Sequence, residues 1–356
     1  MRRALVLLGL SAALLFAWER NLSRRAALER LERSRVGQLV SPEERASLSL
    51  SALRIEERGQ PTRTYGRVRG RWRCIEHFLA PADVGALESL VQSLLDAQGF
   101  VVTDRIDDAS AYGVTGTSAL RVSLCGPKVL EDPGGDVQLA FDLGSSVPRD
   151  GGSFLRRRGE PEVWAVDADP RAFLQHEPAT PPLLEPYVVP RDWPGWRAGL
   201  TRLRIERAQG SRFVLERRRF ELPPEELRAG RVPWRWILQP GSSERDAARL
   251  QSHALSLFVQ RIPFEEVLDP RLREQAFGAA TTDRLVLEAE GVDALELWFA
   301  PLPATRGDDD ADHVAWNPET GTLFRVSGAV VDLALPSVEL FLADSDANPW
   351  HPYLER

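Results

Sequence analysis

The chain has 356 residues with a formal net charge of -7, and 43% of the residues are hydrophobic and 27% charged. This composition is typical of a folded globular protein, and the length predicts about two domains. The acidic balance and the lack of Lys/Arg stripes interleaved with aromatic residues argue against nucleic acid as a partner. Two short basic runs, Arg156–Arg158 and Arg217–Arg219, are interpreted as solvated strand edges or turns, with phosphate or lipid-headgroup binding as the alternative.

Residues 1–20 have the pattern of a membrane-targeting segment. Met1-Arg2-Arg3 precedes an unbroken apolar run from Ala4 to Ala17, and no convincing small-x-small cleavage site comes after it. We therefore expect an uncleaved N-terminal anchor, with a cleaved signal as the alternative. Arginines lie on both sides of this segment, but an apolar segment at the extreme N-terminus usually directs the rest of the chain across the membrane. The body is therefore expected outside the cytoplasmic membrane.

Residues 21–50 predict a helical stalk. From Ser23 to about Val40, apolar residues recur at helical spacing among Glu/Arg pairs three or four positions apart, which supports a solvated helix. Ser41-Pro42-Glu43-Glu44 then predicts a helix start, because it combines capping-box spacing with proline at the first helical position.

Residues 51–174 predict a first domain made of strands, one long helix and more strands. The helix presents an apolar face and is expected to end at Gly99 as a C-cap. The face comprises Leu87, Leu90, Val91, Leu94 and Leu95. The expected strands contain Leu53 and Ile55, Thr62–Val68, Trp72–Ile75, Leu120–Cys125, Val137–Leu143 and Val163–Val166, and Asp169-Pro170 starts a short terminal helix.

Residues 200–345 repeat this pattern, which predicts a second, similar domain. Leu203-Arg204-Ile205-Glu206 echoes Leu53-Arg54-Ile55-Glu56. Further along, Trp234–Ile237 echoes the Trp72 strand, Ser243 to Asp246 has capping-box spacing, and Leu250, Ala254, Leu257 and Phe258 form the expected helix face. Phe277-Gly278 then matches Tyr112-Gly113, and the later strands contain Leu285–Leu287, Leu295–Phe299 and Leu323–Val326. The second copy also carries an insertion, Pro223–Arg231.

A proline-rich connector, 175–199, joins the two copies, and Trp193 and Trp196 within it predict that it packs in an ordered way. Residues 346–356 are expected to be a tail. The predicted fold class is α+β: two similar tandem domains, each a mainly antiparallel sheet covered by one long helix, after the anchor and the stalk.

No residue is assigned a catalytic, cofactor-binding or metal-binding role. The glycine- and hydroxyl-rich run Tyr112–Ser118 lacks the lysine of a phosphate-binding loop and is interpreted as a turn. The five histidines show no paired spacing, and His253 is expected to be a partly buried structural residue. Cys74 and Cys125 are expected to be separate buried thiols, with a disulfide as the alternative. We therefore expect a protein that is not an enzyme and has no cofactor.

Two other features have both a structural and a binding interpretation. Asp308–Asp312, with Glu319 further on, echoes a calcium loop, but His313 occupies the position of the required glycine. A solvated hairpin loop is the preferred interpretation and a weak cation site the alternative. Three tryptophans, Trp72, Trp234 and Trp236, are expected in the core, with a ligand groove as the alternative.

The combined pattern resembles the bacterial DUF4340 family of domains of unknown function. The residues that carry the resemblance are Trp72, Pro81-Ala82-Asp83, Tyr112-Gly113 and Val163-Trp164 in the first copy, and Trp234, Asp246 and Phe277-Gly278 in the second. The resemblance covers about Ser51 to Leu342, and the second copy departs from it by lacking Pro-Ala before Asp246.

Members of the family are envelope proteins often encoded beside ABC-transporter subunits of the gliding-motility type. The resemblance implies a non-enzymatic, membrane-anchored accessory protein with its body in the bacterial periplasm. Its expected partners are the inner membrane, transporter subunits or envelope polymers. The alternative function is a binding module for a glycan, lipid or small molecule at the junction of the two copies.

Overall fold

The computed structural model describes residues 36–116, 119–130, 136–147, 151–174, 183–210, 212–228, 233–240, 244–278, 282–302, 312–342 and 349–354. The expected anchor and the first part of the expected stalk lie outside these residues. Within the described ranges, no helix has the length and apolar character needed to cross a membrane.

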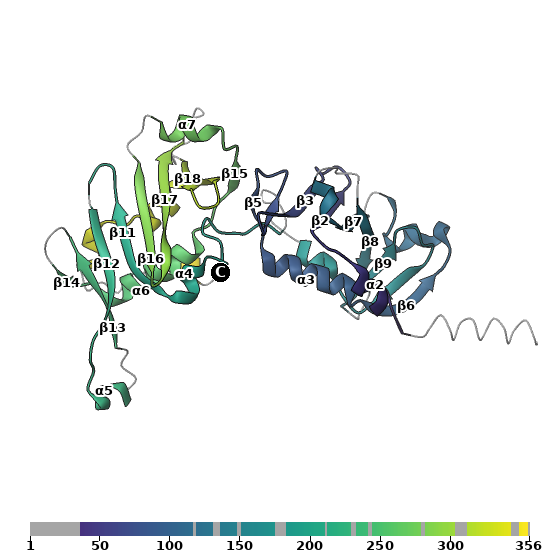
Figure 1. The fold of residues 1–356 in the computed structure, drawn as a ribbon, viewed down its shortest axis with the longest axis horizontal. Coiled ribbons are helices and arrows are strands. Elements are labelled where there is room, and N and C mark those ends of the chain that lie inside the picture. Colours follow the sequence, from purple (N-terminus) through teal and green to yellow (C-terminus); the bar gives the residue numbers. More distant parts are fainter. Residues whose placement is uncertain are drawn as a thin grey trace, which may run out of the picture. The chain divides into compact units, whose positions relative to one another are not determined.

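The protein is mainly β with some helix, and its strands form two large antiparallel sheets (Figure 1). The first sheet has the order β1-β6-β10-β9-β8-β7-β2-β3-β4-β5. Its strands are β1 (Gly37–Gln38), β2 (Ala52–Glu57), β3 (Arg63–Val68), β4 (Arg71–Cys74), β5 (Ala80–Pro81), β6 (Gln98–Thr103), β7 (Leu120–Cys125), β8 (Val137–Ser146), β9 (Ser153–Arg157) and β10 (Val163–Val166). The helices of this part are α2 (Pro42–Ser47), α3 (Val84–Leu95), η1 (Ile106–Tyr112), η3 (Pro127–Leu130) and η4 (Pro170–Leu174).

The second sheet has the order β14-β13-β12-β11-β16-β17-β18-β19-β15. Its strands are β11 (Leu200–Glu206), β12 (Arg212–Arg219), β13 (Trp234–Gln239), β14 (Arg245–Asp246), β15 (Glu266–Leu268), β16 (Asp283–Ala289), β17 (Val292–Pro301), β18 (His313–Asn317) and β19 (Thr322–Val326). The helices are α4 (Pro194–Ala198), α5 (Pro224–Arg228), α6 (Arg249–Phe258), η5 (Val259–Arg261), α7 (Leu272–Phe277), α8 (Gly328–Ala334), η6 (Val338–Phe341) and α9 (His351–Leu354).

By its internal contacts the chain divides into two compact units. Unit 1 comprises Met1–Gly66 and Gly85–Gln175, and unit 2 comprises Arg67–Val84 and His176–Arg356. Strands β4 and β5 therefore belong to unit 2, although they extend the first sheet.

The order of strands is the same in the two sheets once the first is read from β6 and the second from β15. The registers agree as well, because Leu53 lies opposite Leu124 in the first sheet and Leu203 lies opposite Leu287 in the second. All four side chains are fully buried. Burying such a leucine contributes about 1.5–3 kcal/mol, so the Leu-x-Ile pattern seen in the sequence marks the centre of each core.

Helix α3 buries Leu87, Leu90, Leu94 and Leu95, as predicted, while Val91 is half-buried. The helix ends at Leu95, so the prediction that Gly99 is its C-cap is wrong. Gly99 lies in β6 opposite Val166, where an added Cβ would stand 1.9 Å from the carbonyl oxygen of Ala165. The glycine is needed there for close approach between strands.

The predicted start of the second helix is also wrong, and its predicted face is confirmed only in part, because Ala254 and Phe258 are buried but Leu250 and Leu257 are not. Asp246 lies in β14, and α6 begins only at Arg249. Leu250 and Leu257 are 45% and 38% exposed, whereas Leu255, which was not part of the predicted face, is buried. Ser252 is also buried, and its hydroxyl donates to the Ala248 carbonyl at 2.7 Å.

Residues 37–47 belong to the fold of unit 1. Gly37 and Gln38 form β1 against β6, where a helix was predicted up to about Val40. The predicted helix start is confirmed, because the Ser41 hydroxyl accepts a hydrogen bond from the Glu44 amide at 3.2 Å and Pro42 is the first helical residue. The chain is therefore part of the first sheet well before residue 51.

The connector makes the same edge contact on the second sheet. In unit 1, the Leu39 amide donates to the Ala97 carbonyl at 3.1 Å, and in unit 2 the Val188 amide donates to the Ile262 carbonyl at 3.0 Å. A short helix comes after each contact, α2 in the first case and α4 in the second. For the described part of the connector, from residue 183 on, the prediction that it packs in an ordered way is confirmed by Trp193, which is only 3% exposed.

Candidate functional site

The outer face of the first sheet carries a ladder of ion pairs centred on Asp142. The ladder crosses four strands, because Glu56 on β2, Arg121 on β7, Asp142 on β8 and Arg156 on β9 stand side by side in register. Arg121 Nε lies 2.9 Å from Asp142 Oδ1, and Arg156 lies 2.5 Å from Oδ2. The side chain of Asp142 is 1% exposed, so both of its oxygens are held by guanidinium groups away from solvent.

A pocket of about 410 Å³ opens over this ladder. Its wall includes the loop that contains Val114, Thr115 and Gly116. This loop was predicted to be a turn, and Gly113 and Gly116 adopt the positive φ values of 71° and 84° that turns require. Residues 117 and 118 lie outside the described ranges. The pocket lining contains as many arginines as carboxylates, so its charge is balanced internally.

At the positions equivalent to the ion-pair ladder, the second sheet carries tryptophans with arginines packed on their rings. Arg284 on β16 lies opposite Trp298 on β17, just as Arg121 lies opposite Asp142, and Trp298 lies opposite Trp316 on β18. The Arg284 guanidinium stands 4.0 Å from the ring centre of Trp298, and that of Arg273 stands 3.8 Å from the ring centre of Trp316. Cation–π and aromatic packing therefore replace the ion pairs of the first sheet. Sequence reasoning missed both ladders, because they are visible only once the strands are paired.

The three tryptophans expected in the core are not in it. Trp72 and Trp236 are half-buried and Trp234 is 41% exposed. Arginines from the neighbouring strand stack on two of them: Arg67 lies 5.3 Å from the ring centre of Trp72, and Arg217 lies 4.8 Å from that of Trp234. Trp234 begins β13, in a hairpin that runs beyond the rest of the second sheet towards α5, so it reaches solvent (Figure 1).

The connector holds a buried carboxylate, Glu185, which is 5% exposed. Its Oε1 has no hydrogen-bond partner and lies 3.5 Å from Nε of Arg191, which also pairs with Asp83. Burial, together with the negative charge of Asp83, raises the pKa of Glu185 to about 7 despite the nearby guanidinium. Arg191 is 55% exposed, so solvent screens its charge and burial prevails.

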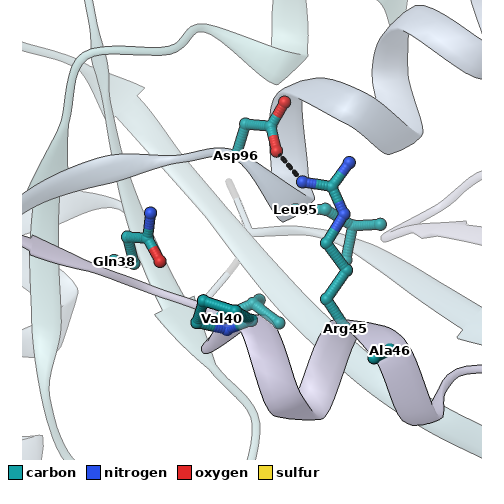
Figure 2. Close-up of a pocket in the computed structure, with 7 residues that line it drawn as sticks. Gln38, Val40, Arg45, Ala46, Leu95 and Asp96 are labelled. Carbon is teal, nitrogen blue, oxygen red and sulfur yellow. Dashed lines mark hydrogen bonds and ion pairs between the residues drawn. The ribbon is translucent and has the colours of Figure 1, made fainter.

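A second concavity lies at the start of unit 1 (Figure 2). Gln38, Val40, Arg45 and Ala46 line one side and Leu95 and Asp96 the other. Arg45 and Asp96 form an ion pair across it, so the two walls are tied together. This arrangement fixes α2 against the end of α3.

The remaining sequence candidates do not come together. Cys74 and Cys125 are separate buried thiols that form no disulfide with each other, as predicted, and burial raises the pKa of the Cys125 thiol. His253 is exposed on α6, so the prediction that it is partly buried is wrong.

The aspartates at 308, 309 and 310 lie outside the described residues, and Glu319, the expected last ligand of that loop, pairs with Arg71 at 3.0 Å. Within the described part of the chain, no three His, Cys, Asp or Glu side chains are grouped so that they could hold a metal ion.

Comparison with protein families identifies part of the chain. The family model "Domain of unknown function (DUF4340)" matches residues 72–179. This part of the chain is a DUF4340 domain. The DUF4340 match begins in β4, takes in α3 and the strands up to β10, and stops before the second sheet. The DUF4340 domain therefore includes Asp142 and Arg156 of the ion-pair ladder but not Glu56. No curated protein and no solved structure matches the chain significantly.

Proposed function

We propose that the protein is a non-enzymatic, membrane-anchored accessory component of an ABC-type transport or envelope assembly. The observation that carries this proposal is the outer face of the first sheet, where the buried carboxylate of Asp142 is held by two arginines. A carboxylate whose oxygens are both engaged by guanidinium groups is poorly suited to proton transfer, but it fixes the shape and charge pattern of a surface. Such a surface suits binding and positioning of a partner.

The fold supports the same proposal. The two sheets have one strand order, and their registers agree at Leu53 and Leu203. The proposal takes them as two copies of one domain, each an antiparallel sheet covered by one helix, α3 or α6. Because the edge contacts of Leu39 and Val188 are equivalent, each copy would begin at such an edge segment and not at residue 51 or 200. Two copies with different outer faces provide two different binding surfaces on one scaffold.

The family resemblance supports a cellular setting for the proposal. The family resemblance implies a bacterial envelope protein whose genes accompany ABC transporters, and the apolar run Ala4–Ala17 would anchor it in the inner membrane with its body in the periplasm. Membrane fractionation of the full chain, compared with a form lacking residues 1–20, tests this topology. The full chain should stay with the membrane, with its body open to protease added from the periplasmic side, and the shortened chain should be released. A shortened chain that remains membrane-bound and cytoplasmic would contradict the proposal.

The alternative is a ligand-binding module, and the pocket beside Asp142 favours it. Its volume of about 410 Å³ lies within the usual range for small-molecule sites. The pocket lies on the outer face of the first sheet. The ligand would therefore bind there and not at the junction of the two copies. Heat-denaturation shifts with a panel of sugars and small zwitterions would test it, with Arg121→Gln as the variant that should abolish any shift.

A further inference from the structure

One side of the β12–β13 hairpin in unit 2 carries arginines stacked on a tryptophan ring. This Arg/Trp face comprises Arg217, Arg219, Trp234 and Trp236. Arg217 lies opposite Trp236 and Arg219 lies opposite Trp234, so the four side chains share one side of the hairpin. The guanidinium groups of Arg217 and Arg219 lie 4.8 and 5.8 Å from the ring centre of Trp234. Figure 1 shows the hairpin running beyond the rest of the second sheet towards α5, so the Arg/Trp face can meet a broad surface.

The other side of the hairpin has balanced charges. Successive residues of a strand alternate between its two sides, so Arg218 and Arg235, which lie opposite each other, belong to that side. Arg218 pairs with Glu216 and Glu244, each at 2.8 Å, and Arg235 pairs with Asp246 at 3.6 Å. Among the described residues, no carboxylate lies within ion-pair distance of either arginine of the Arg/Trp face. The positive charge that is open to a partner is therefore concentrated on that face.

The hairpin is also a basic part of an acidic chain. Residues 217–236 contain six arginines and three glutamates, a net charge of +3, whereas the whole chain has a net charge of -7. An anionic surface therefore attracts the hairpin and repels the rest of the chain on average, so the charge distribution favours an approach with the hairpin first.

The exposed tryptophan indicates which kind of anionic surface fits. Trp234 is 41% exposed, and tryptophan is enriched at the headgroup level of membranes because its ring is apolar while its N–H is polar. A guanidinium group can bind phosphate oxygens through two hydrogen bonds, and stacking of Arg217 and Arg219 on the ring orients them for this. The apolar run Ala4–Ala17 would keep a bilayer within reach of the chain.

We propose that the Arg/Trp face docks on the surface of an anionic phospholipid bilayer. Arg217 and Arg219 bind the phosphates of the headgroups, and Trp234 lies at the headgroup level beside them. The contact holds unit 2 at the membrane independently of the N-terminal anchor. It requires an anionic bilayer and no transporter, so this proposal and the accessory role proposed above can fail separately.

Fluorescence quenching at the hairpin tests the proposal. Glu221 is exposed just beyond β12, while Cys74 and Cys125 are buried, so Glu221→Cys provides an accessible thiol for a bimane label. The labelled full chain is reconstituted into vesicles of phosphatidylcholine alone, or of equal parts of phosphatidylcholine and phosphatidylglycerol, each with a spin-labelled lipid as quencher. The label should be quenched far more strongly in the phosphatidylglycerol vesicles, and added salt should relieve this quenching because the contact is ionic.

A pair of substitutions on the labelled protein tests the residues. Arg217→Gln/Arg219→Gln should lower the equilibrium constant for docking by more than about tenfold, because two arginines are lost from the anionic surface. Arg212→Gln/Arg271→Gln is the matched control: it removes the same charge from two exposed arginines outside the Arg/Trp face, and its quenching should remain unchanged.

The comparison of the two lipids uses an unaltered Arg/Trp face, so it tests the proposal even if a variant does not fold. Quenching that is equal in the two kinds of vesicle, or absent from both, would overturn the proposal. An Arg217→Gln/Arg219→Gln protein that is quenched like its parent, or a control that loses as much quenching as this variant, would also overturn it.

Discussion

Replacing Glu185 by Gln should stabilise the protein at pH 8 and have little effect near pH 4.5. Burial raises the pKa of this carboxyl from 4.5 to about 7, so the folded protein holds its proton more tightly than the unfolded chain. Stability is therefore highest when Glu185 is protonated in both states, falls as the pH rises from about 4.5 to about 7, and is constant above that window. A difference of about 2.5 pKa units corresponds to about 3 kcal/mol.

The position of Glu185 gives a local readout. Its backbone amide donates to the Pro81 carbonyl at 3.0 Å, and the Asp83 amide donates to the Leu183 carbonyl at 2.8 Å. Ionisation of the carboxyl should therefore loosen this pairing within unit 2 and speed amide hydrogen exchange there.

Exchange of residues 81–85 and 183–186 should be measured by mass spectrometry at pH 5.5 and 8, after correction for the intrinsic pH dependence of exchange. The wild type should lose protection at pH 8 and Glu185→Gln should not. Glu221→Gln, which changes an exposed carboxyl, serves as the control. Equal protection of the wild type and Glu185→Gln at pH 8 would show that ionisation of Glu185 does not loosen this pairing.

Four further substitutions test the packing. Asp142→Asn should destabilise the protein by about 3 kcal/mol in denaturant unfolding, because it removes the charge that neutralises two partly buried arginines. Gly99→Ala should cost more than about 1 kcal/mol in the same assay, since its Cβ would meet the Ala165 carbonyl oxygen at 1.9 Å. Leu255→Ala should cost about 3 kcal/mol while Leu250→Ala costs less than about 0.5 kcal/mol, and equal losses would contradict the face assigned to α6.

The cores of both sheets could be predicted from the sequence because aliphatic residues at Leu53, Ile55, Leu203 and Ile205 repeat at strand spacing. The buried face of α3 could also be predicted, because its leucines recur at helical spacing. In α6 the spacing of apolar residues did not predict the buried face correctly, because Ser252 is buried and Leu250 is exposed. A serine can take an inside position when its hydroxyl bonds to the preceding turn, and hydrophobic periodicity does not detect this.

The candidate site was hidden from the sequence for a different reason. Glu56, Arg121, Asp142 and Arg156 are far apart along the chain, and only the registers of β2, β7, β8 and β9 bring them into one ladder. The tryptophans were mispredicted for another reason. Large aromatic side chains are usually buried, so they were expected in the core. Trp234 begins β13 in a hairpin that runs beyond the rest of the second sheet, and there it is 41% exposed (Figure 1).

Affinity purification of the full chain from membranes of the native host, with partners identified by mass, tests the accessory role most directly. We predict that the permease or ATPase subunits of an ABC transporter copurify in fixed proportion, and that an Arg121→Gln/Asp142→Asn variant that remains folded recovers less of them. Recovery of the protein without any transport or envelope component, from membranes in which those subunits are present, would contradict the account.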